Sequence, residues 1–192
     1  MYKRQALRID SAADVELIVS EPEPGSPELF ISEYIEGSSN NKALELYNPT
    51  GGDLDLSNYR VLVYSNGATE TTNITSLSGT LTSGDVFVIY NSSADDLIKA
   101  VGDIEGTATY FNGDDTVVLE KTTDGGTTWE AIDVFGVLGE DPGSSWAVGT
   151  GATNEHTLVR KAGITRGSTT WNPEEWEVYA QNEFGYLGSH TA

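Results

Sequence analysis

The amino-acid sequence predicts an all-β protein, an antiparallel β-sandwich with one short helix. Three observations predict this fold. Short segments in which apolar and polar residues alternate recur after residue 28, clusters of Gly, Asn and Asp separate them, and a single stretch has a helical pattern of apolar residues. At 192 residues the chain is long enough to bury a sizeable core between two sheets.

Residues 1–28 are expected to form a leader or linker in front of the domain. Residues 21–27 contain three prolines, which favour an extended chain. Residues 14–20 are expected either to be disordered or to add an edge strand. The basic residues at positions 3 and 4 are not followed by the apolar stretch typical of a signal peptide. We place the domain itself at residues 29–191.

Seven strands are predicted within the domain, because each segment alternates and is bounded by turn residues. In chain order they are residues 29–35, 43–47, 58–65, 85–90, 116–121, 131–137 and 157–160. The predicted turns include residues 50–53, 82–85 and 124–126, where glycine can supply the positive φ that such turns often need.

The one predicted helix spans residues 93–101. Ser93 is expected to cap it, and Leu97, Ile98 and Val101 are spaced to form one apolar stripe. We expect this helix to be a short excursion between two strands.

The second strand carries a charged residue between two leucines. In a strand Leu44 and Leu46 share one face, so we expect both to point into the core while Glu45 faces outward or toward a paired charge. Asn48 and Pro49 end the strand, because proline cannot donate to the ladder and keeps its predecessor out of regular geometry.

Charge and composition exclude several classes of function. The balance of 10 Lys+Arg against 30 Asp+Glu gives a net charge of −20, which disfavours direct nucleic-acid binding and favours basic partners or divalent cations. The absence of cysteine excludes disulfides and thiolate metal sites, and the two histidines, His156 and His190, are too few for the usual zinc sites. No apolar run is long enough to span a membrane.

Nine short motifs in a fixed order carry a resemblance to a known family. They are LFISEYIEGS (29–38), NKALELYNPT (41–50), DLSNY (55–59), LSGTL (77–81), GDVFVI (84–89), FNGDD (111–115), DVFG (133–136), HTLVRK (156–161) and LGSHT (187–191). Together they resemble the lamin-tail domain in its bacterial form, over about residues 29–191. The resemblance implies an immunoglobulin-like β-sandwich.

The resemblance also implies a function, because bacterial members of that family commonly sit beside secreted nuclease or phosphatase-type domains. We therefore expect a non-catalytic accessory module that is extracellular, either secreted or at the cell surface. Its expected partner is an adjoining catalytic domain or a protein of the envelope or matrix. Two alternatives stay open: a part of a metal-dependent secreted nuclease that contributes substrate or metal binding, and a glycan-binding module.

One structural ion pair is predicted between strands. Glu45 lies on the second strand, and Arg160 is one of the few cations of the domain. We expect the two to pair across neighbouring strands, an interaction worth about 0.2–1 kcal/mol. The alternative is that these charges recognise a ligand.

One possible metal site lies in the loop before the fifth predicted strand. Asn112, Asp114 and Asp115 offer the oxygen ligands that Ca²⁺ prefers, although the loop lacks the spacing of an EF-hand. The alternative is a turn in which Asn and Asp side chains bond the local backbone.

Aromatic residues gather in the second half of the chain. They are more typical of a core than of a carbohydrate-stacking platform, and the set is Trp129, Trp146, Trp171, Trp176, Tyr179 and Phe184. The sequence lacks the Gly-x-Ser-x-Gly and P-loop motifs, so it favours recognition through loops over catalysis. The loops expected at the recognition ends are residues 36–41, 68–76, 112–115 and 139–145.

Overall fold

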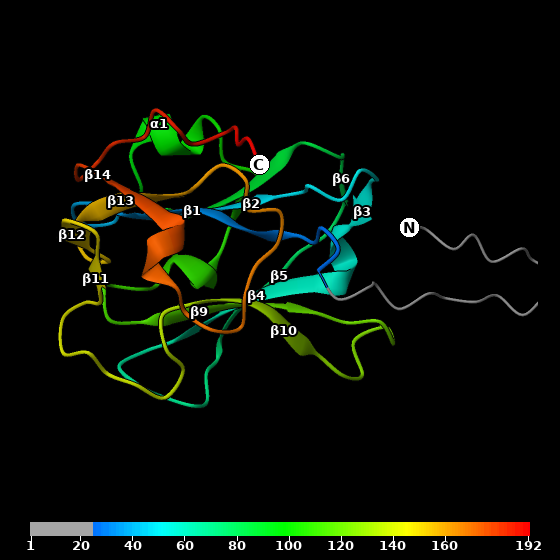
Figure 1. Cartoon of the computed structure of the whole chain (residues 1–192), viewed down its shortest axis with the longest axis horizontal. Helices are drawn as coiled ribbons and strands as arrows, with labels where there is room; N and C mark the ends of the chain where they lie inside the picture. Colours follow the sequence, from blue (N-terminus) through cyan, green and yellow to red (C-terminus); the bar gives the residue numbers. More distant parts are fainter. Residues whose placement is uncertain (1–24) are drawn as a thin grey trace, which may run out of the picture.

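Two facing β-sheets form the body of the protein in the computed structural model, which describes residues 25–192 (Figure 1). The leader predicted at residues 1–28, with its possible edge strand at 14–20, lies outside the described residues except for its last four positions. The predicted all-β, immunoglobulin-like sandwich with one short helix is confirmed.

The first sheet has six strands in the order β14-β13-β1-β2-β7-β8. They are β1 (Phe30–Glu36), β2 (Lys42–Tyr47), β7 (Val86–Tyr90), β8 (Ile104–Glu105), β13 (His156–Arg160) and β14 (Trp176–Tyr179). All neighbours are antiparallel except β7 and β8, which run parallel.

The second sheet has four antiparallel strands in the order β10-β9-β4-β5. They are β4 (Tyr59–Tyr64), β5 (Asn73–Ser76), β9 (Thr116–Lys121) and β10 (Glu130–Phe135). Two short pairs complete the strands: β3 (Leu54–Asp55) with β6 (Thr80–Leu81), and β11 (Ala147–Val148) with β12 (Gly151–Ala152). The helical turns are η1 (Leu56–Asn58), α1 (Asp96–Lys99), η2 (Thr107–Thr109) and η3 (Pro173–Glu175).

Each of the seven predicted segments contains a strand, since local alternation is the signal that a half-buried strand leaves. Two longer strands were not predicted. β5 carries a single apolar residue, Ile74, and its neighbours are polar. β14 follows directly on the helical turn η3, so no turn cluster marks its start.

The helix is shorter than predicted and starts later. Asp95, and not Ser93, caps α1, because its carboxylate accepts the Leu97 backbone N–H at 2.9 Å. The predicted apolar stripe is wrong at Leu97 and Val101, which are 68% and 43% exposed, whereas Ile98 is fully buried. A helix of about one turn presents few side chains to the sheet below it. Within the described part of the chain, no helix is long and apolar enough to cross a membrane.

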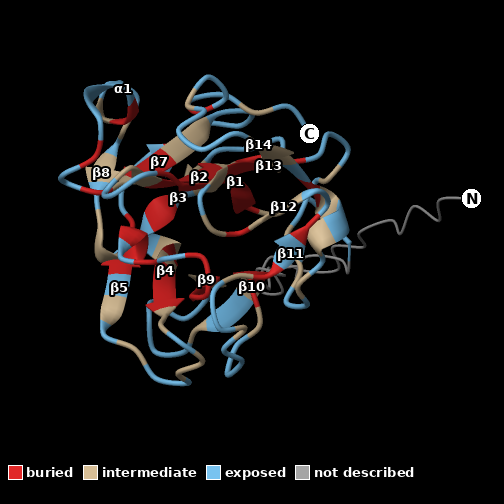
Figure 2. Ribbon diagram, turned by 90° about the vertical axis from the view of Figure 1, so that its left-hand side faces the viewer, coloured by how far each residue is buried: buried red, intermediate tan, exposed pale blue. Residues whose placement is uncertain are grey.

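The main core lies between the two sheets (Figure 2), where buried residues concentrate on strands such as β1, β2 and β4. Leu44 and Leu46 belong to it, as the alternation of the second strand predicts. Tyr34 stacks at its centre between Phe111 and Phe135, with ring centroids 4.5 and 4.1 Å away. Such stacked rings add to the free energy gained from their burial.

A second, smaller core covers the outer face of the six-stranded sheet. It consists of Ile35, Ala43, Val88, Ala94, Ile98 and Leu187. Helix α1 and the C-terminal segment, residues 180–192, run over this face (Figure 1). This cover explains why Glu45, expected to face outward or toward a paired charge, is completely buried.

The predicted ion pair between Glu45 and Arg160 does not form. Arg160 shares the inward face of β13 with the core residue Leu158, whereas Glu45 lies on the opposite face from Leu44. The two charges therefore point to opposite sides of one sheet. Arg160 instead pairs with Asp133 of β10, at 3.0 Å between Nη2 and Oδ1.

Glu28, the last residue of the predicted leader, is bound to the sandwich. Its Oε1 accepts the Tyr59 hydroxyl at 2.9 Å, and its Oε2 lies 2.5 Å from Lys121 Nζ. Contacts with the sandwich therefore include a residue that precedes the predicted boundary.

Candidate functional site

A pocket of about 300 Å³ opens at one end of the sandwich, where loops far apart in the sequence meet. Three of its walls are the end of β1, the loop before β9 and the loop between β12 and β13; the fourth is the loop before β11. The lining residues are Glu36, Asn112, Gly113, Asp114, Gly143, Ser144, Asn154 and Glu155. Three of the four predicted recognition loops contribute to it, while residues 68–76 instead contain β5.

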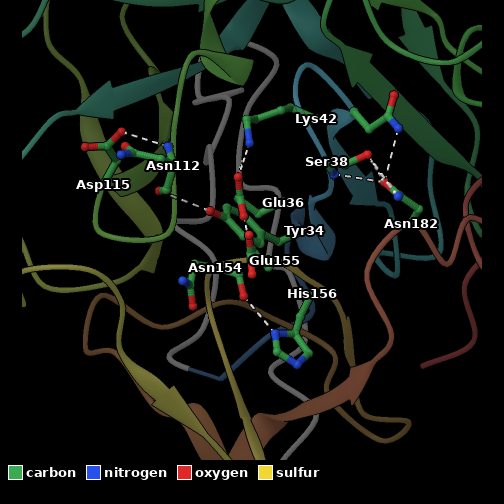
Figure 3. A network of polar contacts seen from close by, with 11 residues as sticks. Tyr34, Glu36, Ser38, Lys42, Asn112, Asp115, Asn154, Glu155, His156 and Asn182 are labelled. Atoms are coloured by element: carbon green, nitrogen blue, oxygen red, sulfur yellow. Dashed lines mark hydrogen bonds and ion pairs between the residues drawn. The ribbon is translucent and has the colours of Figure 1, made fainter.

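Glu36 fixes the first wall of the pocket (Figure 3). It is the last residue of β1 and lies opposite Lys42 of β2 and His156 of β13. Its Oε1 forms an ion pair with Lys42 Nζ, and its Oε2 accepts the backbone N–H of Glu155. The charge of Glu36 is thus compensated within the protein.

The same contact holds Glu155 in an unusual backbone conformation. Its φ is +54°, in the left-handed region that residues other than glycine rarely adopt. The neighbouring residues are also fixed, since Asn154 O lies 2.7 Å from His156 Nδ1. The side chain of Glu155 is exposed at the rim.

Asp115 stabilises the loop of the second wall. Its Oδ2 accepts the Asn112 N–H at 3.0 Å, and its Oδ1 accepts the Asn66 N–H at 2.9 Å. Burial raises the pKa of Asp115, and the two backbone N–H groups act in the opposite direction. Tyr34 adds a hydrogen bond from its hydroxyl to Asn112 O at 3.4 Å (Figure 3).

This geometry favours the turn over the calcium site that Asn112, Asp114 and Asp115 could form. Both oxygens of Asp115 are used by backbone donors, so few lone pairs remain for a cation. Among residues 25–192, no group of three or more His, Cys, Asp or Glu side chains is placed to hold a metal ion. The contacts of Asp115 are thus those of the predicted turn, and the calcium site at Asn112, Asp114 and Asp115 stays a prediction.

Asp114 differs from its neighbour, although it lines the same pocket. The residue is only 6% exposed, and its Oδ1 is buried without a hydrogen-bond partner. A buried carboxylate oxygen in this state has lost its water without a replacement, which is costly. Asp114 is the one acidic residue of the pocket with such an orphaned oxygen.

Thr153 joins two walls of the pocket. Its side chain is fully buried; Oγ1 donates to Gly113 O and accepts the Trp146 N–H at 3.0 Å. The Thr153 N–H also donates to Trp146 O at 3.0 Å. The loop before β9 is therefore fixed to the β11–β12 hairpin by Thr153, a role that no motif around this residue indicates.

Replacing Gly113 with alanine is expected to disrupt this wall. A Cβ at this position would lie 2.2 Å from Asn154 Cβ and 2.5 Å from Asn154 Cα, so backbone must move. We expect a loss of about 1–3 kcal/mol in the free energy of unfolding, measured by urea denaturation. Gly52→Ala is the matched control, because a Cβ there meets nothing within 4 Å. Equal stability of the two variants would contradict the close contact.

Asn182 anchors the loop of residues 36–41 beside the pocket (Figure 3). Its Oδ1 accepts the Ser38 N–H at 2.9 Å and the Asn41 Nδ2 group at 3.1 Å, and its Nδ2 donates to Ser38 Oγ at 3.0 Å. The C-terminal segment thereby fixes a loop more than 140 residues away, a contact that the sequence does not indicate.

A pair of buried carboxyl groups lies away from the pocket, under the C-terminal segment. Glu33 and Glu45 face each other directly across β1 and β2. Glu45 accepts the Ser32 hydroxyl and the Gly188 N–H, each at 2.7 Å. Both oxygens of Glu33 are buried without partners, and burial, helped by Glu45 and Glu183, raises the pKa of Glu33 to about 9.

The aromatic residues do not form one exposed platform. Trp171 and Trp176 pack on Phe135, with ring centroids 4.6 and 5.1 Å away. Trp146 is 9% exposed, and Trp129 lies elsewhere, 4.2 Å below the guanidinium of Arg60. The four indole rings thus pack in different parts of the fold.

Comparison with known proteins agrees with the motifs in the sequence. The family model described as Lamin Tail Domain matches residues 22–137, which contain strands β1 to β10. No curated protein and no solved structure gave a match. The residues beyond the match contain β13 and β14, which complete the six-stranded sheet, and the two loops that form two walls of the pocket. Lamin tail domains are immunoglobulin-like domains with binding or structural roles. The match spans more than half of the chain and agrees with the observed sandwich, and the protein belongs to the lamin tail domain family.

Proposed function

We propose that this chain is a non-catalytic interaction module of a larger secreted bacterial protein. Its loop end contacts a partner, either an adjoining hydrolase domain of the nuclease type or a protein of the envelope or matrix. The acidic composition and the absence of cysteine suit such a module, and the resemblance of the motifs to the bacterial form of the lamin tail domain supports a place beside secreted enzymes.

The observation that carries this proposal is the preformed pocket. Its walls are tied together by the Thr153 hydroxyl and by the Glu36 carboxylate, which accepts the Glu155 N–H. A surface that is rigid before binding loses little conformational entropy when a partner docks. A pocket with fixed walls therefore favours recognition of a partner through shape and charge.

Two carboxylates at the site, Glu36 and Asp115, support a structural role rather than acid–base catalysis. A general base needs a free lone pair within reach of the proton that it removes. Glu36 is paired with Lys42, and both oxygens of Asp115 accept backbone N–H groups. These two groups therefore serve to shape the site.

A turnover assay on the purified chain tests the proposal. We expect no hydrolysis of DNA or RNA with Mg²⁺ or Ca²⁺ present, measured by release of acid-soluble nucleotides over hours. Sustained hydrolysis that Asp114→Ala abolishes would instead make the chain part of a metal-dependent nuclease. Saturable quenching of tryptophan fluorescence by a polysaccharide would instead make it a glycan-binding module.

A further inference from the structure

We infer that the loop-end pocket binds an arginine side chain presented by a protein partner. This inference rests on the proposed function, since it names the chemical group by which the interaction module would recognise its partner. The group enters between the walls that carry Asp114 and Glu155.

The lining of the pocket has the chemistry that a guanidinium group requires. Of the eight lining residues, three are acidic, none is basic, and the others are asparagine, serine or glycine. Arginine carries five N–H donors and no acceptor, so a wall of carboxylate, amide and hydroxyl oxygens matches it. The volume of about 300 Å³ leaves room for one such side chain.

Two of the three acidic residues keep their charge available to a ligand. Glu36 is already paired with Lys42 and with the Glu155 N–H. The carboxylate of Asp114 has a buried oxygen without a donor, and that of Glu155 is exposed at the rim. The pocket therefore presents about two uncompensated negative charges.

The orphaned oxygen of Asp114 is the observation that points to a ligand. Asp114 is 6% exposed and its Oδ1 has no hydrogen-bond donor, so a partner that donates to this carboxylate from the pocket recovers part of the hydration lost on burial. Arginine donates two parallel N–H groups to one carboxylate, and it is less strongly hydrated than lysine, so it enters a shielded site at lower cost.

Other ligand classes fit less well. A phosphate or another anion would be repelled by the lining and by the net charge of −20. In the part of the chain that the structure describes, no three acidic or imidazole side chains are placed to hold a metal ion together. The strong negative charge of the chain also speeds the approach of a basic partner, and added salt would weaken this effect.

The test is an NMR titration of the ¹⁵N-labelled chain with Nα-acetyl-arginine amide. Nα-acetyl-citrulline amide serves as the matched neutral compound, because it keeps the shape and loses the charge. We expect saturable shifts of backbone amide signals at Gly113, Asp114, Ser144 and Glu155 with the arginine compound. With the citrulline compound these signals should not move.

Variants assign the binding to the pocket. Asp114→Asn should weaken the binding of the arginine compound at least about fivefold, the loss expected for a charged hydrogen bond. Asp96→Asn, which changes the net charge equally at a highly exposed position on α1, should leave it unchanged. If Asp114→Asn does not fold, Glu155→Gln tests the site instead, because the side chain of Glu155 is exposed. This substitution should weaken the binding of the arginine compound at least about twofold.

The outcomes separate this inference from the proposed function. Absent shifts at the pocket, equal shifts with citrulline, or unchanged affinity in the decisive variant would overturn the arginine site alone. Nucleic-acid hydrolysis that depends on Asp114 would overturn the proposed function itself.

Discussion

Replacing Asp133 with alanine is expected to lower the free energy of unfolding by about 3–5 kcal/mol, the loss typical of a broken buried ion pair. Asp133 is fully buried, and its Oδ1 accepts Arg160 Nη2 and the Ser168 N–H, each at 3.0 Å. Its Oδ2 accepts the Ile31 N–H at 2.9 Å. The substitution therefore leaves one buried and one half-buried backbone donor, the N–H groups of Ile31 and Ser168, without acceptors, and one buried cation without its main partner.

Burial dominates the electrostatics of this pair. It raises the pKa of Asp133, although the neighbouring Arg160 and the two backbone N–H groups act to lower it. Arg160 is 3% exposed, and its remaining anion is Glu175, at 3.3 Å. Arg160 also stacks on Trp176, 4.6 Å from the ring centroid, so the pair is packed as well as bonded.

A double-mutant cycle separates the pair from general damage to the core. Asp133→Asn and Arg160→Gln should show a coupling energy of about 2 kcal/mol or more, measured by urea unfolding. The matched cycle of Glu45→Gln with Arg160→Gln should show a coupling near zero, because those side chains lie on opposite faces of the sheet. A larger coupling in the second cycle would restore the ion pair that the structure excludes.

Replacing Glu33 with glutamine is expected to stabilise the protein at alkaline pH. Glu33 is 1% exposed, both its oxygens lack partners, and Glu45 lies opposite on the next strand. Its pKa is raised from 4.5 to about 9, chiefly by burial. Near neutral pH the folded protein therefore holds a proton that the unfolded chain has released.

The sign of the pH dependence follows from this difference. Below about pH 4.5 Glu33 is protonated in both the folded and the unfolded state, so it does not lower the free energy of unfolding. As the pH rises toward 9, only the unfolded state releases the proton, and the free energy of unfolding falls. At pH 8 the free energy of unfolding of Glu33→Gln should exceed that of the wild type by about 3 kcal/mol or more. At pH 4 the two free energies should be nearly equal. Urea unfolding at several pH values measures the difference.

Glu130→Gln is the matched control for this prediction, since Glu130 is exposed on β10. It should follow the wild type within about 0.5 kcal/mol across the same range, as surface substitutions usually do. A constant difference between Glu33→Gln and the wild type at all pH values would show that Glu33 is not a buried, protonated carboxyl group.

Much of the fold could be predicted from the sequence, because strand alternation and turn chemistry are local signals. The second strand illustrates this: Leu44 and Leu46 point inward as their spacing requires. The burial of Glu45 could not be predicted from the local sequence, because the segment that covers it lies about 143 residues further along the chain. The same alternation that places Leu158 in the core also places Arg160 there, and this signal could have excluded the pair with Glu45.

Only part of the pocket could be predicted from the sequence, for a related reason. The loop of residues 112–115 could be recognised by its residue types, and the structure places Asn112, Gly113 and Asp114 in the wall of the pocket. Thr153 and Asn182 have no such signature, because their importance comes from hydrogen bonds that span 40 and 144 residues. The sequence also could not distinguish Asp114 from Asp115, whose roles depend on which backbone N–H groups surround each carboxylate.

A crystal structure of the chain with bound Nα-acetyl-arginine amide tests the central claim most directly. The account predicts the guanidinium group between Asp114 and Glu155, with its N–H groups within about 3 Å of the Asp114 carboxylate. The walls fixed by Thr153 and Glu36 should stay in place, since the pocket is preformed. A pocket left empty while the compound binds elsewhere, or one that holds a metal ion on Asp114 instead, would contradict the account.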